Sequence, residues 1–248
     1  MKKLLFLYGL LFTVVSSYSQ ALNAKIKYQA TLNSDEFYAR FIKDSLISDN
    51  LKKLYTEDIS NSVPDVFYLL IKGNEALYKA QFDPEKRVNL GHKPNWTNNI
   101  AQYENVYYTN TNTNENFFKS FWTRGVVVNL NEVKWTLTEE TKIIGGYTSY
   151  KAISTIESEQ LYGMNYMSPV VAWYTPEIAT SFGIKEFNGL PGLILELITD
   201  HEYGKVIYKV TDIDLNPKGE IIIERPKGKR EMSFKEYLEY IKKLNERR

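Results

Sequence analysis

The chain contains no cysteine and only two histidines among its 248 residues. The lack of cysteine excludes disulfide bonds and thiolate chemistry, so the fold must be stabilised by buried apolar side chains. It also disfavours a lipoprotein-type anchor, because lipoprotein processing requires a cysteine at the mature N-terminus. His92 and His201 stand in no metal-ligand spacing, so we interpret both as turn or surface residues rather than as metal ligands or general bases.

Neither sign of charge dominates, since 31 Lys and Arg face 30 Asp and Glu. We therefore expect no nucleic-acid partner. The one long apolar run, Leu4 to Val15, is shorter than a bilayer requires and follows two lysines. Together with the small polar residues up to Gln20, it predicts a cleaved signal peptide over residues 1–20. We expect an exported protein, periplasmic or outer-membrane-associated, with no transmembrane span in the mature chain.

Aromatic residues are abundant, with 19 Tyr and 12 Phe, and they favour strands. Residues 21–248 fit one β-rich domain. Residues 83–104 show neither the helical nor the strand spacing of apolar residues, so we expect a long loop there. Short turns between most of the strands predict antiparallel pairing in a meander. The predicted strands cover residues 24–32, 66–71, 75–82, 106–109, 116–122, 126–130, 134–138, 147–156, 170–174, 193–199, 205–212 and 220–225.

Helical spacing is found near the two ends of the mature chain. Residues 35–55 predict a helical segment, and Ser233 with Glu236 forms a capping box that begins a helix reaching Leu244. We therefore predict an α+β fold in one domain. Its mostly antiparallel sheet is curved or forms a half-open β-barrel, with an N-terminal helical segment and a C-terminal helix packed on it.

A turn leads directly into an apolar strand at the hexapeptide Gly189, Leu190, Pro191, Gly192, Leu193 and Ile194. Gly189 and Gly192 can take positive φ, and Pro191 fixes its own φ, which predicts a rigid corner. Apolar residues then occupy both faces of the strand, so we expect it to be central. Glu196 interrupts one of these faces.

The hexapeptide and three earlier segments resemble, in the right order, the GLPGLI family of secreted Bacteroidota proteins. The three segments are residues 135–137, 142–152 and 171–178. The resemblance implies export and no established activity. Many relatives have a cysteine where this chain has Ser149, so any role of that thiol is not available here. Gly183-Ile184 stands where relatives often have Gly-Pro, which predicts a looser corner.

The candidate ligand-binding residues are Trp135, Tyr147, Trp173, Tyr174 and Glu196. The four aromatic residues fall in predicted strands, where they either pack in the core or line an apolar groove. A carboxylate among isoleucines makes Glu196 a candidate functional acid. A half-open barrel with a helix across its mouth is also the architecture of periplasmic lipoprotein carriers, which is an analogy of fold alone.

Several alternatives stay open for these charges. Glu196 has a structural interpretation, an ion pair with Lys205 or Lys209 on the next strand. Lys142 and Lys151 are either solvated or mark an anionic ligand at the rim.

The sequence favours binding over catalysis. Ser149 and Ser168 lack the strand-to-helix turn of a nucleophilic serine, and we expect no metal and no cofactor. Our leading hypothesis is a binding or accessory protein for an apolar small molecule or an outer-membrane transporter. The runner-up is a periplasmic hydrolase that uses Glu196 and Glu177, and the third is a purely structural interaction protein.

Overall fold

The computed structural model describes residues 21–35, 38–39, 43, 45–81, 95–102, 104–121, 123, 125–154, 169–201 and 204–246. The predicted signal peptide, His92 and Ser168 lie outside these residues. The strands are β1 (Asn23–Asn33), β2 (Asp65–Lys72), β3 (Glu75–Ala80), β4 (Val106–Asn110), β5 (Glu115–Ser120), β6 (Val126–Asn129), β7 (Thr136–Ile144), β8 (Tyr147–Ser154), β9 (Val170–Thr175), β10 (Leu193–His201), β11 (Gly204–Asp214) and β12 (Arg230–Ser233).

These twelve strands form one unclosed sheet in the order β12-β6-β5-β4-β3-β2-β1-β11-β10-β9-β8-β7. Strands β2 to β6 are one antiparallel meander and β7 to β11 are another, as the short turns predicted. β1 joins the two by pairing with β2 on one side and β11 on the other. The exception to antiparallel pairing is β12, which runs parallel to β6 at the edge of the sheet.

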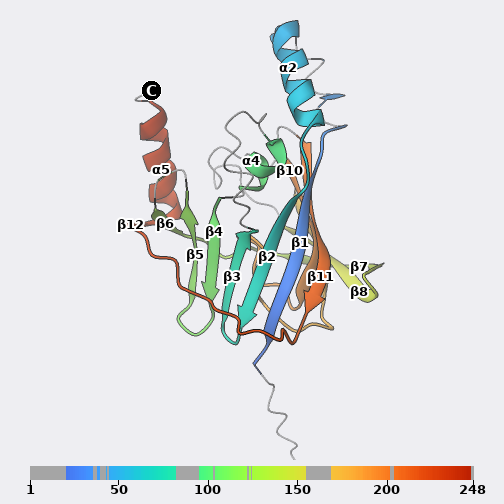
Figure 1. Cartoon of the computed structure of the whole chain (residues 1–248), viewed down its shortest axis with the longest axis vertical. Helices are drawn as coiled ribbons and strands as arrows, with labels where there is room; N and C mark the ends of the chain where they lie inside the picture. Colours follow the sequence, from blue (N-terminus) through green and yellow to red (C-terminus); the bar gives the residue numbers. More distant parts are fainter. Residues whose placement is uncertain are drawn as a thin grey trace, which may run out of the picture.

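The inner face of the sheet carries the main apolar core. The sheet bends so that the short helix α4 (Trp96–Ala101) lies within the curve and contacts β1 and β11 (Figure 1). The segment 176–192 also packs here. Five of its apolar residues are buried in the main cluster: Ile178, Phe182, Ile184, Phe187 and Leu190. Side chains from most of the strands meet these residues, so the curve is filled by one continuous core.

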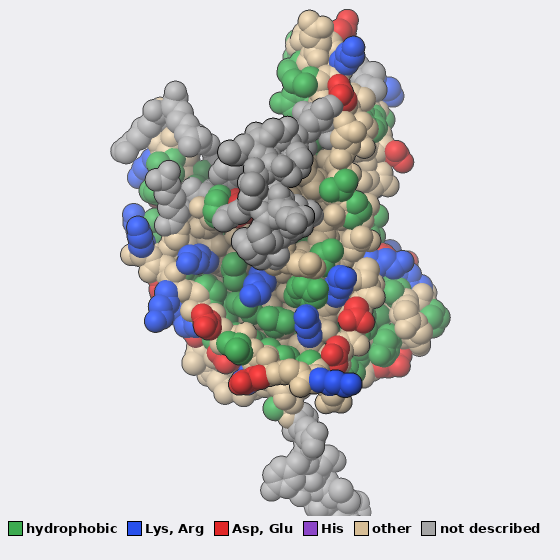
Figure 2. Space-filling model, viewed as in Figure 1, with side chains coloured by type: hydrophobic (Ala, Val, Ile, Leu, Met, Phe, Trp, Pro, Cys, Tyr) green, Lys and Arg blue, Asp and Glu red, His purple; other side chains and the backbone are tan. Residues whose placement is uncertain are grey.

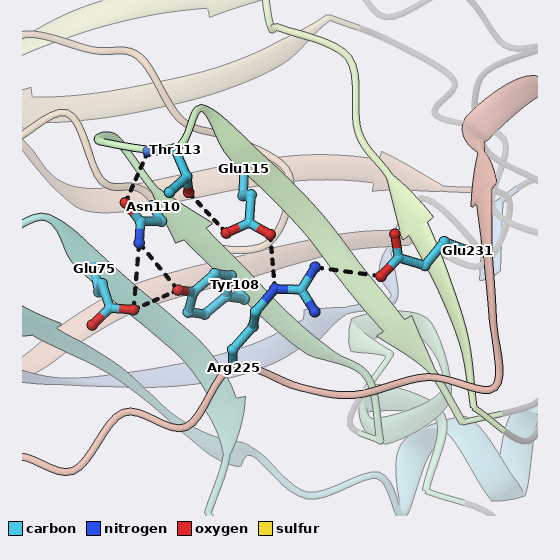
Figure 3. A network of polar contacts seen from close by, with 7 residues as sticks. All are labelled: Glu75, Tyr108, Asn110, Thr113, Glu115, Arg225 and Glu231. Carbon is cyan, nitrogen blue, oxygen red and sulfur yellow. Dashed lines mark hydrogen bonds and ion pairs between the residues drawn. The ribbon is translucent and has the colours of Figure 1, made fainter.

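The outer face carries a smaller apolar cluster on the β3–β6 side, made of Leu77, Tyr108, Phe117 and Val127. The chain between β11 and β12 lies against it, because Ile223 packs on this cluster and the Arg225 guanidinium lies 4.9 Å from the centre of the Phe117 ring. Arg225 also pairs with Glu115 at 2.7 Å and Glu231 at 3.3 Å (Figure 3). These contacts fix the connection that delivers β12 to the sheet edge.

The strand predictions were wrong at two places here: on the connection between β11 and β12, and at β12 itself. Residues 220–225 are not a strand, because they run along the outer cluster without joining the ladder of hydrogen bonds. The side chains of this segment alternate between the outer cluster and solvent, since Ile223 packs on the cluster while Ile222 is 65% exposed. β12 was not predicted, since four residues give too short a pattern. Trp135 also precedes β7 rather than lying in a strand, and α4 occupies part of the predicted loop.

The two helix predictions had different outcomes. The helix α5 (Phe234–Asn245) has the predicted Ser233–Glu236 capping box and packs on the sheet, with the Tyr237 ring 5.7 Å from that of Phe118. The predicted N-terminal helical segment is confirmed only in part. Asp35, Tyr38 and Ala39 are helical and the Tyr38 N–H donates to the Ser34 carbonyl at 2.9 Å, while the helix α2 (Asp49–Ser60) begins after the N-cap Ser48 and runs past Tyr55.

The hexapeptide 189–194 forms the predicted corner, which we call the GLPGLI corner. One of its two glycines is needed there for a different reason from the one predicted. Gly189 has φ +93°, as expected. Gly192 is not in the positive-φ region; instead, a Cβ placed there would lie 2.1 Å from the Thr175 carbonyl oxygen. The close approach of two backbones therefore requires this glycine. β10 follows as a central strand between β9 and β11, as predicted.

Asn188 holds the corner against the rest of the fold. Its Oδ1 accepts from the Gly183 N–H at 2.8 Å, and its Nδ2 donates to Asn116 Oδ1 at 3.2 Å. Its carbonyl accepts from the Trp135 indole N–H at 2.9 Å. Gly183 is tightly enclosed, since a Cβ there would meet the Phe187 carbonyl oxygen at 1.7 Å. The Gly183-Ile184 segment is therefore held firmly, in contrast to the looser corner that the sequence predicted.

Candidate functional site

A row of aromatic side chains crosses the inner face of the sheet. Tyr78, Tyr107 and Phe118 lie opposite one another on β3, β4 and β5, because the strand register places them in line. The Phe67 ring of β2 stacks on Tyr78 at 5.3 Å and meets the edge of Tyr208 from β11 at 6.1 Å. Alternation along each strand directs all five rings to the same face, so the row joins the two meanders.

Two hydroxyls in this row are buried without a hydrogen-bond partner. The Tyr78 and Tyr208 side chains are 2% and 0% exposed, and neither hydroxyl finds a partner among the described residues. Two neighbouring tyrosines differ from them. Tyr28 donates to the Ile194 carbonyl at 2.7 Å, and Tyr107 donates to Gln102 Oε1. A buried hydroxyl with no partner costs about 1 to 3 kcal/mol, so the two orphan hydroxyls call for an explanation.

A tight turn places two opposite charges in the same interior. The Phe187 N–H donates to the Ile184 carbonyl at 3.1 Å, which leaves Lys185 and Glu186 at the turn's centre. Their side chains are 2% and 6% exposed. Lys185 has φ +55°, a conformation that non-glycine residues rarely adopt. The Lys185 Nζ lies 5.7 Å from the centre of the Tyr208 ring, so the turn belongs to the same site.

The buried tyrosines of the row have raised pKa values. Burial raises the pKa of Tyr78, Tyr107 and Tyr208, and the charge of Glu186 raises all three further. After burial, the charge of Tyr208 is the largest cause that raises the pKa of Tyr78. Burial lowers the pKa of Lys185, and Glu186 opposes that shift. The tyrosines are therefore neutral hydrogen-bonding groups at physiological pH.

His201 is a buried neighbour of this site and not the surface or turn residue that the sequence predicted. It ends β10 on the inner face, is 1% exposed and has its Nε2 2.8 Å from Thr199 Oγ1. Burial, together with the Lys185 charge, lowers the pKa of His201 to about 3. The imidazole is therefore neutral at physiological pH, and the interior gains no positive charge from it.

Two of the sequence-predicted site residues share the other side of the sheet. Glu196 of β10 and Trp173 of β9 are register partners. The Lys142 Nζ lies 2.7 Å from Glu196 Oε1 and 4.2 Å from the centre of the Trp173 ring. The predicted pairing of Glu196 with Lys205 or Lys209 was wrong in its partner, because Lys142 reaches across from β7. Glu196 is thus held in an ion pair.

The remaining three predicted residues lie in separate places. Trp135 packs against Phe187, with ring centres 6.2 Å apart. Tyr174 is buried and contacts Tyr150 from β8, and Tyr147 begins β8 at the edge of the main core. The five predicted residues are therefore not brought together at one point. Their involvement in ligand binding stays a prediction.

Sequence reasoning missed the aromatic row and the charged turn. A partial signal was present, because Lys185 and Glu186 are adjacent charges between the apolar residues Ile184 and Phe187. The signal for Tyr78 and Tyr208 was alternation within their strands, but the same pattern describes any core tyrosine. Only the sheet order places residues 130 positions apart on one row.

The other chemical candidates find little support within the described ranges. Glu177, the second carboxylate of the hydrolase alternative, accepts from the Thr148 N–H at 2.8 Å. No group of three or more histidine, aspartate or glutamate side chains there is arranged to hold a metal ion. None of the helices in the part of the chain that the structure describes is long and apolar enough to cross a bilayer. Figure 2 shows Lys, Arg, Asp and Glu intermixed on the visible face rather than gathered by sign.

We expect the Glu196–Lys142 pair to contribute modestly to stability. Glu196→Gln should lower the free energy of unfolding by about 1 kcal/mol, because Glu196 is 12% and Lys142 35% exposed and water screens the pair in part. Glu140→Gln is the matched control. It breaks the pair with Lys151 at 2.8 Å, but Glu140 is 60% exposed, so urea unfolding should show no more than about 0.5 kcal/mol of change. Equal losses in the two variants would contradict a special role for the Glu196 pair.

Comparison with protein families gives one short match. The model described as "Protein of unknown function (Porph_ging)" matches residues 163–196, a region that contains the GLPGLI hexapeptide. The match covers too little of the chain to assign it to that family. No curated protein matches the chain in sequence.

Comparison with solved structures extends over most of the chain. A structure of PNGF-II in the C2 space group shares 15% sequence identity with a TM-score of 0.50 and covers 88% of this chain. The matched region is 33% of PNGF-II, so this chain spans about a third of that protein's length. At this identity the likeness shows a shared fold and nothing about activity.

Two further structures are less similar. LprF from Mycobacterium bovis shares 11% identity over 84% of this chain and 90% of its own, with a TM-score of 0.32. A putative outer membrane lipoprotein-sorting protein domain from Vibrio parahaemolyticus shares 7% identity over 82% of this chain and 88% of its own, also with a TM-score of 0.32. At this TM-score, no function follows from either likeness.

Proposed function

We propose that this protein binds a small, mostly apolar molecule at the inner face of its curved sheet. The observation that carries the proposal is the pair of buried hydroxyls on Tyr78 and Tyr208 that find no partner among the described residues. They lie in a row of aromatic rings, which offers apolar contact beside two hydrogen-bonding groups. Ligand sites commonly combine an apolar lining with a few well-placed polar groups.

The stability of the fold does not account for these hydroxyls. Phenylalanine would fill nearly the same volume at either position and would leave no hydroxyl to desolvate. Residues that lower stability without a structural benefit are typical of binding sites. The strained backbone of Lys185 at the same site fits this pattern. Together these features favour a binding site over a core built for stability alone.

We propose that the protein acts after export, in the periplasm or at the outer membrane, and belongs to the GLPGLI family. The N-terminal segment supports export, because two lysines precede the apolar run from Leu4 to Val15. The hexapeptide and its three companion segments support the family. An accessory role beside an outer-membrane transporter is compatible with ligand binding, since a carrier needs a site that delivers its ligand.

The test is whether the mature protein carries or takes up a small molecule. Native mass spectrometry of the protein released from the periplasm should show a bound species, and the apolar dye N-phenyl-1-naphthylamine should bind with saturation at one site. The Tyr78→Phe/Tyr208→Phe double variant should retain less of the copurified species than wild type. Tyr240→Phe, a half-buried tyrosine on α5, should retain as much as wild type. A ligand-free mass together with no saturable dye binding would contradict the proposal.

A further inference from the structure

The two edges of the sheet differ in how they are protected. At one edge, β12 is only four residues long and leads directly into α5. At the other edge, β7 is nine residues long and pairs, among the described strands, with β8 alone (Figure 1). The main-chain groups of an edge strand can pair with a further strand, and natural sheets prevent this with short, bulged or charged edges. The edge at β7 is therefore the longer and the more open of the two.

A bulge protects the first half of β7. Residues 138–140 stand opposite the single residue Lys151 of β8. Thr138 Oγ1 donates to the Lys151 carbonyl at 3.1 Å and accepts from the Glu140 N–H at 3.3 Å, which holds the bulge in place. A bulge interrupts the regular row of main-chain groups that a further strand would need. This leaves residues 141–144 in regular strand geometry, and we call them the open edge.

The alternation of hydrogen bonds along the hairpin determines which main-chain groups of the open edge point outward. Strands β7 and β8 are joined by a two-residue turn, 145–146, so Ile144 exchanges hydrogen bonds with its β8 partner and Ile143 does not. The register partner of Ile143 is Thr148, whose N–H donates instead to Glu177 Oε1 at 2.8 Å. The N–H and C=O of Ile143 therefore point away from β8.

Thr141 repeats the orientation of Ile143, because the alternation has a period of two residues. No hydrogen bond to the outward groups of either residue is found in the part of the chain that the structure describes. The Ile143 side chain is 69% exposed. Lysines often protect sheet edges, but the Lys142 Nζ lies 2.7 Å from Glu196 Oε1 and 4.2 Å from the centre of the Trp173 ring. The open edge can therefore pair with an extended chain.

The sequence of the open edge is complementary to a second copy of itself. In antiparallel pairing about a two-fold axis at Lys142, Thr141 of each copy stands opposite Ile143 of the other, and each such pair exchanges two main-chain hydrogen bonds. Both residues are β-branched, which favours packing across the strands. The two Lys142 side chains meet at the axis, but each has its own Glu196 as counter-charge. The 31 Lys and Arg and 30 Asp and Glu of the chain nearly cancel, so two copies do not repel each other.

We infer that two copies of this protein associate through residues 141–144 of β7, which pair antiparallel and join the two sheets into one. The contact is small, because a four-residue edge buries far less than the roughly 1,200 Å² of total surface found in stable interfaces. The dimer is therefore weak, with a dissociation constant of about 10 to 300 μM. Its interface is the edge of the sheet, so its formation does not depend on ligand binding at the inner face.

Sedimentation velocity of the mature protein at concentrations from about 1 to 300 μM tests the inference. The weight-average sedimentation coefficient of wild type should rise over this range. Ile143→Lys places a further charge on the edge and should raise the dissociation constant at least about tenfold. Ile222→Lys is the matched control, because Ile222 is 65% exposed but lies on the connection between β11 and β12, and it should behave as wild type. A wild type that stays monomeric, or an Ile143→Lys variant that dimerises as well as wild type, would overturn the inference.

The absence of cysteine from the chain allows a second test, which reports the register of the two strands. Lys142→Cys places one thiol of each copy at the two-fold axis. Opposed residues of such a non-hydrogen-bonded pair have Cα atoms about 4.5 Å apart, which is within the range of a disulfide. Mild oxidation should therefore link Lys142→Cys into a covalent dimer at least about tenfold faster than Ile222→Cys. Equal rates of linkage in the two variants would overturn the inferred pairing.

Discussion

Gly192→Ala should destabilise the fold strongly, and more than Gly189→Ala in the same hexapeptide. Its Cβ would lie 2.1 Å from the Thr175 carbonyl oxygen and 2.6 Å from the carbonyl carbon. Backbone atoms cannot move aside as a side chain does, so β9 and β10 would have to separate where they pair at Leu193. We expect a loss of about 3 kcal/mol in the free energy of unfolding, measured by urea denaturation.

Two other glycines separate this effect from backbone strain. Gly189→Ala has open space around the added Cβ but keeps φ +93°, so it should cost about 1 to 2 kcal/mol. Gly219→Ala has open space and no positive φ, and it should change stability by less than about 0.5 kcal/mol. A Gly192→Ala variant as stable as Gly219→Ala would show that the two backbones do not lie in close contact.

The second large effect is a gain in stability. Tyr78→Phe and Tyr208→Phe each remove a buried hydroxyl that has no partner among the described residues, so each should raise the free energy of unfolding of the ligand-free protein by about 1 kcal/mol. For a chain of this size, that gain corresponds to a melting temperature about 2 to 4 °C higher. Circular dichroism melts of the delipidated variants measure it.

Tyr28→Phe is the control of opposite sign. Its hydroxyl donates to the Ile194 carbonyl at 2.7 Å and is buried like the other two. Removing it leaves that carbonyl without this donor, so we expect a loss of about 1 kcal/mol or more. If all three variants were destabilised alike, the Tyr78 and Tyr208 hydroxyls would be satisfied in the free protein, and the evidence for a ligand there would disappear.

Much of the fold could be predicted because its signals are local. Alternating side chains and short turns predicted the two meanders, and a capping box predicted α5 at Ser233. The hexapeptide predicted both the corner and the central position of β10. The strand at 220–225 was wrong because alternation reports contact with an apolar surface on one side, which the outer cluster provides without any strand partner.

The candidate site could not be predicted because it depends on contacts between distant segments. Tyr78 and Tyr208 meet only because β1, near the N-terminus, joins the two meanders. The burial of Lys185 and Glu186 depends on the enclosure of the segment 176–192 within the curve, whereas an isolated Lys-Glu pair predicts a solvated turn. The same limit applied to Glu196, whose partner Lys142 lies three strands away in the sheet rather than on the next strand.

The most direct test of the central claim is the difference in melting temperature between the protein as purified with its ligand and the delipidated protein, for wild type and for the Tyr78→Phe/Tyr208→Phe variant. A ligand that binds only the folded state stabilises it according to its affinity. We predict that wild type melts at a clearly higher temperature with its copurified ligand than without it. The variant, although more stable when empty, should show little or no rise. An equal rise in both proteins, or none in wild type, would contradict the claim that these two hydroxyls bind a ligand.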